Sequence, residues 1–250
     1  MSDEAVSIKD LYFRYRGQSD DCIKNLHLQI NKGERFGLFG PNGAGKTTLL
    51  NCITGLLKYQ QGSVSIFGQE VNHNRKKINN FFGLVPQDFS FYDELSPQEN
   101  LSFFGAWSGL NSLQIKKKSE ELLQILGLTE VRNKPVKKFS GGMKRRVNLA
   151  IGVIHDPEIL FLDEPTVGVD VHSRQAIINY LLALNKNGTT LIYTSHQLNE
   201  AEELCNRVAL MDDGKILADD NLTSLLFEHR EDGLEGLFIK LTGKAYRDSQ

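Results

Sequence analysis

The chain is organised around the stretch Gly40-Pro41-Asn42-Gly43-Ala44-Gly45-Lys46-Thr47-Thr48. It follows a short apolar run at residues 36–39 and precedes an apolar pattern of helical period at residues 49–57. A glycine-rich loop between a strand and a helix is the context that a phosphate-binding loop requires, because its N–H groups and the helix dipole converge on one point. In that context Lys46 reaches the β- and γ-phosphates and the Thr47 hydroxyl holds Mg²⁺. The sequence therefore predicts a nucleoside triphosphate site.

The composition is that of an ordinary globular protein. Of 250 residues, 40% are hydrophobic and 24% are charged, and the formal net charge is -2, so there is no basic footprint for nucleic acid. Cys22, Cys52 and Cys205 are widely spaced and are expected to be reduced thiols. At the polar, acidic start Met1–Glu4 we expect no signal peptide, and the apolar runs are too short to span a bilayer. Membrane association would therefore need a partner.

Apolar patterns place strands on both sides of a largely helical stretch. Residues 6–13 and 22–30 nearly alternate, which favours antiparallel strands, and 208–217 is typical of a hairpin. Residues 88–157 are mostly helical in pattern, with a helix start at Ser96-Pro97-Gln98-Glu99. From about residue 226 the sequence is polar and weakly periodic.

Polar side chains follow three predicted strands at the edge where α/β sheets bind ligands. Asp163 and Glu164 end the apolar run 159–162, and Asp163 suits Mg²⁺ while Glu164 can polarise a water for attack on the γ-phosphate. Gln87 follows 81–85 and is either a solvated loop residue or a ligand of Mg²⁺ or of the attacking water. His196 follows 189–194, where a structural hydrogen bond competes with a contact to the γ-phosphate.

A second glycine motif, Phe139-Ser140-Gly141-Gly142-Met143, opens a later helix. It is either a simple cap or a second anion-binding nest for a nucleotide held elsewhere. The basic residues after it are either a solvated face or a source of positive potential; they are Lys144, Arg145 and Arg146.

Two aromatic features carry open alternatives. Tyr15, at the end of the first strand, either stacks on a base or packs on the sheet edge. The loop Phe89-Ser90-Phe91-Tyr92 is hard to bury, and we expect it to dock a partner.

Together these elements resemble, over essentially the whole chain, the nucleotide-binding domain of an ATP-binding-cassette (ABC) protein. Tyr15 matches the adenine-stacking aromatic, Gln87 the Q-loop and His196 the switch histidine. Residues 139–143 resemble the family signature, although they read FSGGM in place of the commoner LSGGQ. Residues 159–165 resemble the Walker B strand with Glu164, and Val167-Gly168-Val169-Asp170 resembles the D-loop.

The resemblance implies the fold of the chain and a second cassette as its partner. It implies an α/β phosphate-loop NTPase core with a mainly parallel sheet, an N-terminal antiparallel β-subdomain and an inserted helical subdomain at about 88–157. The cassette would span 1–225, followed by a short extension at 226–250. Two cassettes, identical or paralogous, would dimerise head-to-tail, with ATP bound between the copies and contacted by Ser140, Gly141, Gly142 and Asp170.

SGGMKRR and the ending Leu237–Gly243 resemble stand-alone cassettes of bacterial exporters for drugs, lipids or polysaccharides. Such a cassette lies in the cytoplasm on the inner face of the membrane and binds an integral-membrane permease. A second hypothesis is a soluble cassette acting on translation or chromosomes, but the chain has one phosphate loop and no long coiled coil. A GTPase or small-molecule kinase is a third, although Asn185-Lys186-Asn187-Gly188 lacks the Asp of a guanine-reading motif.

Overall fold

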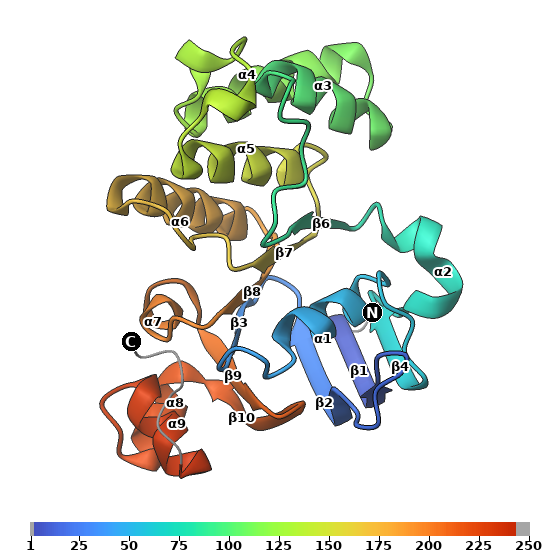
Figure 1. The fold of residues 1–250 in the computed structure, drawn as a ribbon, viewed down its shortest axis with the longest axis vertical. Helices are drawn as coiled ribbons and strands as arrows, with labels where there is room; N and C mark the ends of the chain where they lie inside the picture. The colour runs from blue at the N-terminus through green and yellow to red at the C-terminus, as the bar shows by residue number, and fades with distance from the viewer. Residues whose placement is uncertain (1–2, 244–250) are drawn as a thin grey trace. The chain divides into compact units, whose positions relative to one another are not determined.

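The computed structural model describes residues 3–243 (Figure 1). They belong to two compact units. The first takes the chain up to Asn79 and again from Thr190 onward, and the second is Asn80–Thr189.

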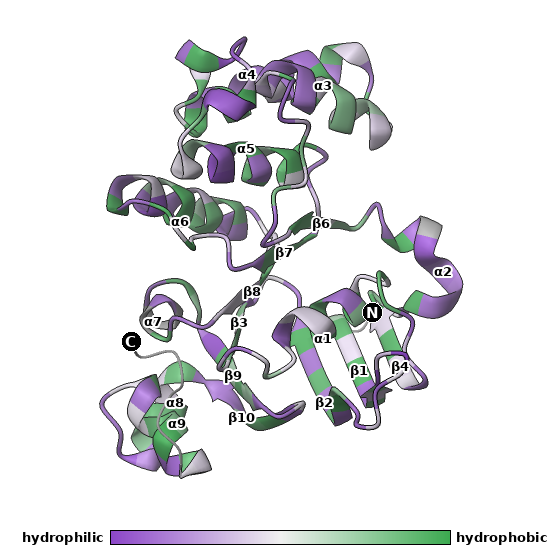
Figure 2. Cartoon of the chain, in the orientation of Figure 1, coloured by the Kyte–Doolittle hydropathy of each residue, from purple (hydrophilic) through white to green (hydrophobic). Residues whose placement is uncertain are grey.

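The first unit begins with an antiparallel sheet of order β2-β1-β4-β5. Its strands are β1 (Glu4–Phe13), β2 (Ile23–Asn31), β4 (Gln61–Ile66) and β5 (Gln69–Glu70). Buried and exposed residues alternate along β2, which Figure 2 shows as alternating green and purple bands. The antiparallel pairing of β1 with β2, predicted from that alternation, is confirmed.

The second set of strands in this unit is mainly parallel. It consists of β3 (Arg35–Phe39), β8 (Thr190–Ser195), β9 (Arg207–Asp212) and β10 (Lys215–Asn221). Strand β3 pairs in parallel with both β8 and β9, and β10 returns antiparallel to β9 as the predicted hairpin. Every residue of β8 is buried, as expected for a strand covered on both faces.

Five helices accompany these strands among the described residues of the first unit. They are α1 (Lys46–Ile53), α2 (Val71–Ile78), α7 (Asn199–Leu204), α8 (Leu222–His229) and α9 (Leu234–Thr242). Helix α1 ends at Ile53, earlier than the apolar pattern to residue 57 suggests, because Gly55 turns the backbone with φ 71°. The expected start of the extension, residue 226, falls inside α8.

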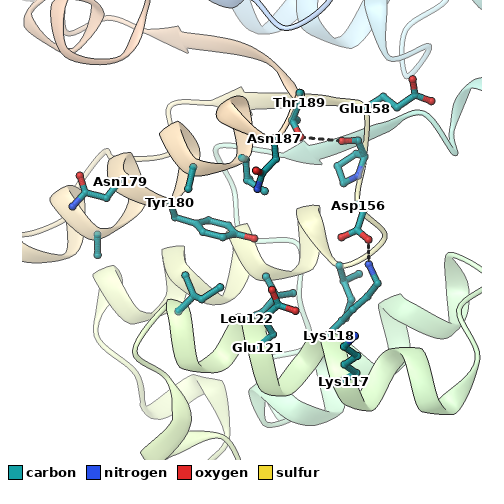
Figure 3. Close-up of a pocket in the computed structure, with 17 residues that line it drawn as sticks. Lys117, Lys118, Glu121, Leu122, Asp156, Glu158, Asn179, Tyr180, Asn187 and Thr189 are labelled. Atoms are coloured by element: carbon teal, nitrogen blue, oxygen red, sulfur yellow. Dashed lines mark hydrogen bonds and ion pairs between the residues drawn. The ribbon is translucent and has the colours of Figure 1, made fainter.

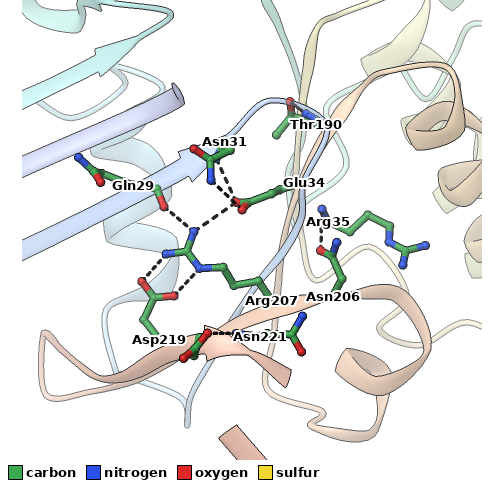
Figure 4. A network of polar contacts seen from close by, with 11 residues as sticks. Gln29, Asn31, Glu34, Arg35, Thr190, Asn206, Arg207, Asp219 and Asn221 are labelled. Atoms are coloured by element: carbon green, nitrogen blue, oxygen red, sulfur yellow. Dashed lines mark hydrogen bonds and ion pairs between the residues drawn. The ribbon is translucent and has the colours of Figure 1, made fainter. Parts of the chain in front are cut away.

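A partly buried arginine joins the two sheets of the first unit (Figure 4). Arg207 on β9 donates to both carboxylate oxygens of Asp219 on β10, at 2.9 and 2.8 Å. It also donates to the Gln29 carbonyl of β2 at 2.9 Å and to Glu34 at 3.3 Å. Burial raises the pKa of Asp219, while the bonds from Arg207 oppose that rise. The network therefore depends on Arg207 to neutralise two carboxylates.

The second unit has two parallel strands, β6 (Phe82–Val85) and β7 (Ile159–Asp163), with every residue of β7 buried. Its helices are α3 (Pro97–Trp107), α4 (Ser112–Ile125), α5 (Gly141–Val153) and α6 (Val171–Lys186), with 3-10 turns η1 (Thr129–Val131) and η2 (Val136–Lys138). The helix start at Ser96 is confirmed, with a reciprocal capping box to Glu99.

The predicted α/β class is confirmed by these elements: an N-terminal antiparallel sheet, mainly parallel strands beyond it, and helices α3 to α5 between β6 and β7. None of the helices between residues 3 and 243 combines the length and the apolar character needed to cross a bilayer.

Candidate functional site

The phosphate loop, Gly40–Thr48, connects β3 to α1 in the first unit. Glycine is required at residue 40, because a Cβ there would lie 2.1 Å from the Met211 carbonyl oxygen of β9. Gly45 has φ 106° and is the N-cap of α1, so no side chain of this residue caps the first turn. Uncapped N–H groups at a helix start are an anion-binding arrangement.

Lys46 lies inside this loop with only 5% of its surface exposed. Its Nζ donates to the carbonyl oxygens of Gly40 at 2.6 Å and Pro41 at 3.1 Å. A buried ammonium held by the loop's own carbonyls is pre-positioned for the phosphates of a nucleotide.

Two other predicted residues of the first unit lie by the ends of this loop. The Tyr15 hydroxyl is 2.9 Å from Oγ1 of Thr48, and its ring is half-exposed with its edge against Phe13. His196 follows β8, whose Ser195 pairs in register with Phe39 of β3. The phosphate loop and His196 therefore leave the same edge of this parallel pair.

The second unit brings Gln87, Asp163 and Glu164 to the end of its own parallel pair. Val85 pairs with Leu162, so the residues after β6 and β7 emerge together. The Gln87 Nε2 donates to Oε2 of Glu164 at 3.1 Å. Asp163 and Glu164 are 3% and 5% exposed, and such buried carboxylates persist only where something compensates them.

Glu164 also has an unusual backbone, with φ 49° in the left-handed region. This conformation costs about 1–3 kcal/mol for a residue with a side chain and is concentrated at functional sites. Among the seven described non-glycine residues with positive φ, Glu164 alone is buried, which favours a functional interpretation of the acidic pair over ordinary loop charges.

The signature segment, residues 139–143, starts α5 in the second unit. Ser140 is the N-cap, and its Oγ accepts from Met143 N at 3.3 Å. A Cβ on Gly142 would lie 2.8 Å from Ser173 Oγ and 2.9 Å from Asp170 Oδ2. Asp170 itself caps α6 by accepting from Ser173 N at 3.0 Å, and this bond lowers its pKa. The signature segment and the Asp170 turn are thus packed together within one chain.

Arg145 and Asn148 on α5 form hydrogen bonds with the segment around Gln87. These contacts are not predicted from the sequence. Arg145 is 6% exposed, so the solvated-face interpretation is wrong for this residue. It donates to the Gln87 carbonyl oxygen at 2.6 Å, and Asn148 donates to that of Pro86 at 3.2 Å. The i, i+3 spacing places both on one helix face, but spacing alone does not identify what that face contacts.

The aromatic loop at residues 89–92 is exposed, as predicted. Phe89 is 41% and Tyr92 is 50% exposed, and Tyr92 contacts Phe103 of α3 edge to face. Trp107, at the end of α3, is 82% exposed. The docking role of this loop remains a hypothesis.

A cavity of about 1060 Å³ lies elsewhere in the second unit, between α4, α6 and the chain before β7 (Figure 3). Tyr180 points into it, and Lys118 and Asp156 form an ion pair at its side. None of the predicted site residues lines it.

Comparison with known proteins identifies the class to which this fold and these motifs belong. Residues 23–167 match the family model described as ABC transporter, so the chain belongs to the ABC transporter family. It is 41% identical over 222 residues to the linearmycin resistance ATP-binding protein LnrL of Bacillus subtilis, covering 89% of this chain and 70% of that protein. It is 33% identical over 235 residues to the daunorubicin resistance ATP-binding protein DrrA3 of Streptomyces coeruleorubidus, covering 94% and 74%.

Solved structures agree with this assignment. An ATP-binding subunit of an ABC transporter superposes with a TM-score of 0.87 at 26% identity, covering 95% of this chain and 99% of that one. A dimeric ATP-binding cassette in a post-hydrolysis state, bound to ADP and Pi, superposes with a TM-score of 0.80 at 28% identity, covering 87% and 98%. The chain is an ATP-binding cassette with the ATPase fold of this family.

Proposed function

We propose that this chain hydrolyses ATP as the motor subunit of a bacterial exporter and works as a head-to-tail pair of cassettes on a membrane permease. The names of its relatives support export, because LnrL and DrrA3 are resistance proteins. A third relative is the Nod factor export ATP-binding protein I of Rhizobium sp. (strain N33). It is 37% identical to this chain, and the match covers 83% of this chain and 68% of that protein. The chemical nature of the cargo is set by the permease and not by this chain.

The observation that carries the proposal is the bond from Gln87 to Glu164 at the end of β7. The bond fixes one carboxylate oxygen of Glu164, and the other is the proposed base that takes a proton from the attacking water. Gln87 also orients that water through its amide oxygen. His196, at the edge shared with the phosphate loop, is the proposed contact to the γ-phosphate.

The phosphate loop holds the nucleotide in this scheme. Backbone N–H groups of the loop Gly40–Thr48, apart from Pro41, which has none, bind the phosphates, and Lys46 neutralises the charge that develops on them. Tyr15 stacks on the adenine, since its ring is half-exposed beside Thr48.

Mg²⁺ fits the oxygen donors that the chain offers, namely the Thr47 hydroxyl, the Asp163 carboxylate and the Gln87 amide oxygen. The ion prefers one or two carboxylates plus substrate phosphates over an all-protein cage. When bound, it would neutralise phosphate charge during transfer.

The signature segment completes the site of a second copy. Ser140 and Gly141 are exposed at the start of α5, where N–H groups can meet a γ-phosphate across a two-fold interface. Asp170, packed against Gly142, lies on the same surface. The dimeric cassette bound to ADP and Pi supports this arrangement.

The permease would hold the cassette at the cytoplasmic face of the membrane, with a permease helix docked on the exposed aromatic loop at residues 89–92.

The test is Mg²⁺-dependent ATP hydrolysis by the purified chain. Lys46→Ala is expected to abolish ATP binding and turnover, while Lys58→Ala, which changes an exposed lysine, leaves both unchanged. Chelation of divalent cations stops turnover. Wild-type turnover in Lys46→Ala would overturn the assignment of the phosphate loop.

A further inference from the structure

The segment from Pro86 to Leu95, which we call the Gln87 loop, is attached along its length to the residues that begin and precede α5. At its far end Leu95 accepts a bond from Val136 N at 2.9 Å, and Asp93 accepts from Lys137 N at 2.9 Å. Asp93 also pairs with Lys144 at 3.2 Å. The loop that carries Gln87 is therefore joined to the helix that carries the signature segment.

Arg145 makes the central attachment. Its Nη1 donates to the carbonyl oxygens of Gln87 at 2.6 Å and Pro86 at 3.3 Å. Its guanidinium carbon lies 4.9 Å from the centre of the Phe89 ring, a cation–π distance. One side chain thus holds the loop on both sides of the Gln87 side chain.

Asn148, one turn further along α5, makes the second attachment and is 1% exposed. Its Nδ2 donates to the Pro86 carbonyl oxygen at 3.2 Å, and its Oδ1 accepts from Ser90 N at 3.3 Å and Ser90 Oγ at 3.2 Å. Arg145 and Asn148 together form what we call the α5 clamp.

Holding the loop in this way costs free energy, because it buries the charged side chain of Arg145. The Arg145 Nε is buried without a hydrogen-bond partner in the part of the chain that the structure describes. Burial lowers the pKa of Arg145, and the nearby charges of Glu164, Asp88 and Asp163 oppose this. A well-packed apolar side chain often stabilises a fold as well as a buried ion does. An arginine at this position is therefore better explained by a need to place the Gln87 loop.

We propose that Arg145 and Asn148 are positioning residues that set the place of Gln87, and through its bond to Glu164 the place of the base, from the helix that begins at Ser140. The proposal rests on the proposed catalytic role of Gln87. It makes the Gln87 loop and the signature segment one mechanical element, so a displacement of one in a given copy displaces the other.

The experiment is a double-mutant cycle on ATP hydrolysis by the purified chain with Arg145→Met and Gln87→Ala. Arg145→Met is expected to lower kcat by about tenfold with little change in KM, since small misplacements of a reacting group cost up to about a hundredfold. Gln87→Ala is expected to lower kcat to a similar extent. Because Arg145 acts through Gln87, the double variant should be no slower than Gln87→Ala alone.

A purely structural arginine would give a different pattern. Its loss would slow Gln87→Ala by the same factor as it slows the wild type, and that additive result would overturn the proposal while leaving Gln87 in place. Wild-type turnover in Gln87→Ala would instead reject the catalytic role of Gln87 itself.

Three further variants complete the design. Arg145→Lys keeps the charge and a donor for the carbonyls, so it is expected to recover part of the lost kcat. Arg132→Met removes an exposed arginine of the same unit and should leave kcat unchanged. If Arg145→Met does not fold, Asn148→Ala replaces it in the cycle. A double variant no slower than Gln87→Ala then supports the proposal, and an additive loss of kcat overturns it.

Discussion

The amide nitrogen of Gln87 lies 3.1 Å from a carboxylate oxygen of Glu164, and this bond joins the ends of β6 and β7. It places an exposed residue in contact with one of the most buried acids of the unit. A change at the surface of the Gln87 loop can therefore reach the carboxylate directly, which is what coupling hydrolysis to a partner protein requires.

Replacing Glu164 by Gln is expected to keep ATP binding and to lower single-turnover hydrolysis by about 10²–10⁴-fold, because the amide cannot accept the proton of water. The ATP-bound dimer should then accumulate, as seen by size-exclusion chromatography. Glu158→Gln, which neutralises an exposed acid before β7, is the matched control and should hydrolyse normally. A wild-type single-turnover rate in Glu164→Gln would remove Glu164 as the base.

Gly142→Ala should be less stable than Gly141→Ala by about 1 kcal/mol, because its Cβ would displace the side-chain oxygens Ser173 Oγ and Asp170 Oδ2. Gly141→Ala is the matched control, since its Cβ would find the Gly168 oxygen at an ordinary 3.6 Å. Thermal unfolding followed by circular dichroism measures both. Equal midpoints for the two variants would show that the contact between the signature segment and the Asp170 turn is not tight.

Arg207→Ala should lower the free energy of unfolding by about 1–3 kcal/mol, because it leaves the partly buried Asp219 and Glu34 without their shared cation. Lys215→Ala removes an exposed cation from the same hairpin and should change stability by less than about 0.5 kcal/mol. Urea titration compares them. A small effect at Arg207 would mean that the network contributes little to joining the two sheets.

The stability of the protein should fall as the pH drops below 6.5, which is the ordinary pKa of a histidine side chain. His155 accounts for part of this fall. Burial lowers the pKa of His155 in the folded state, where its Nε2 lies 3.1 Å from the Phe82 carbonyl oxygen. The unfolded chain then binds the proton first, so acid favours unfolding.

His155→Gln tests this, because the amide can keep the bond to Phe82 but does not titrate. Its unfolding midpoint should depend less on pH than that of the wild type between about pH 5 and pH 7. Parallel curves for the two proteins would assign the pH dependence to other groups.

Much of this fold follows from local sequence. A few neighbouring residues are enough to predict the helix after the phosphate loop, the helix start at Ser96 and the buried strand β7. The structure confirms these three elements. Helices α8 and α9 are harder to predict, because their apolar residues pack on a hairpin and on each other, and the sequence there is only weakly periodic.

The α5 clamp could not be predicted for a different reason. Arg145 belongs to a run of three basic residues, and nothing local distinguishes the buried one from its neighbours. Its partners are main-chain carbonyls far away in the sequence, which leave no side-chain signal. The packing of Gly142 on Asp170 is equally long-range, although both residues belong to recognisable motifs.

Mixing two inactive variants tests whether the phosphate loop of one copy works with the signature segment of another. Lys46→Ala inactivates the phosphate loop and leaves the signature segment intact. Ser140→Arg inactivates the signature segment and leaves the phosphate loop intact. Mixed in equal amounts, they should recover about a quarter of the wild-type ATPase rate, because about half of the dimers have one intact site. A mixture as inactive as either variant alone would contradict a site shared between two copies.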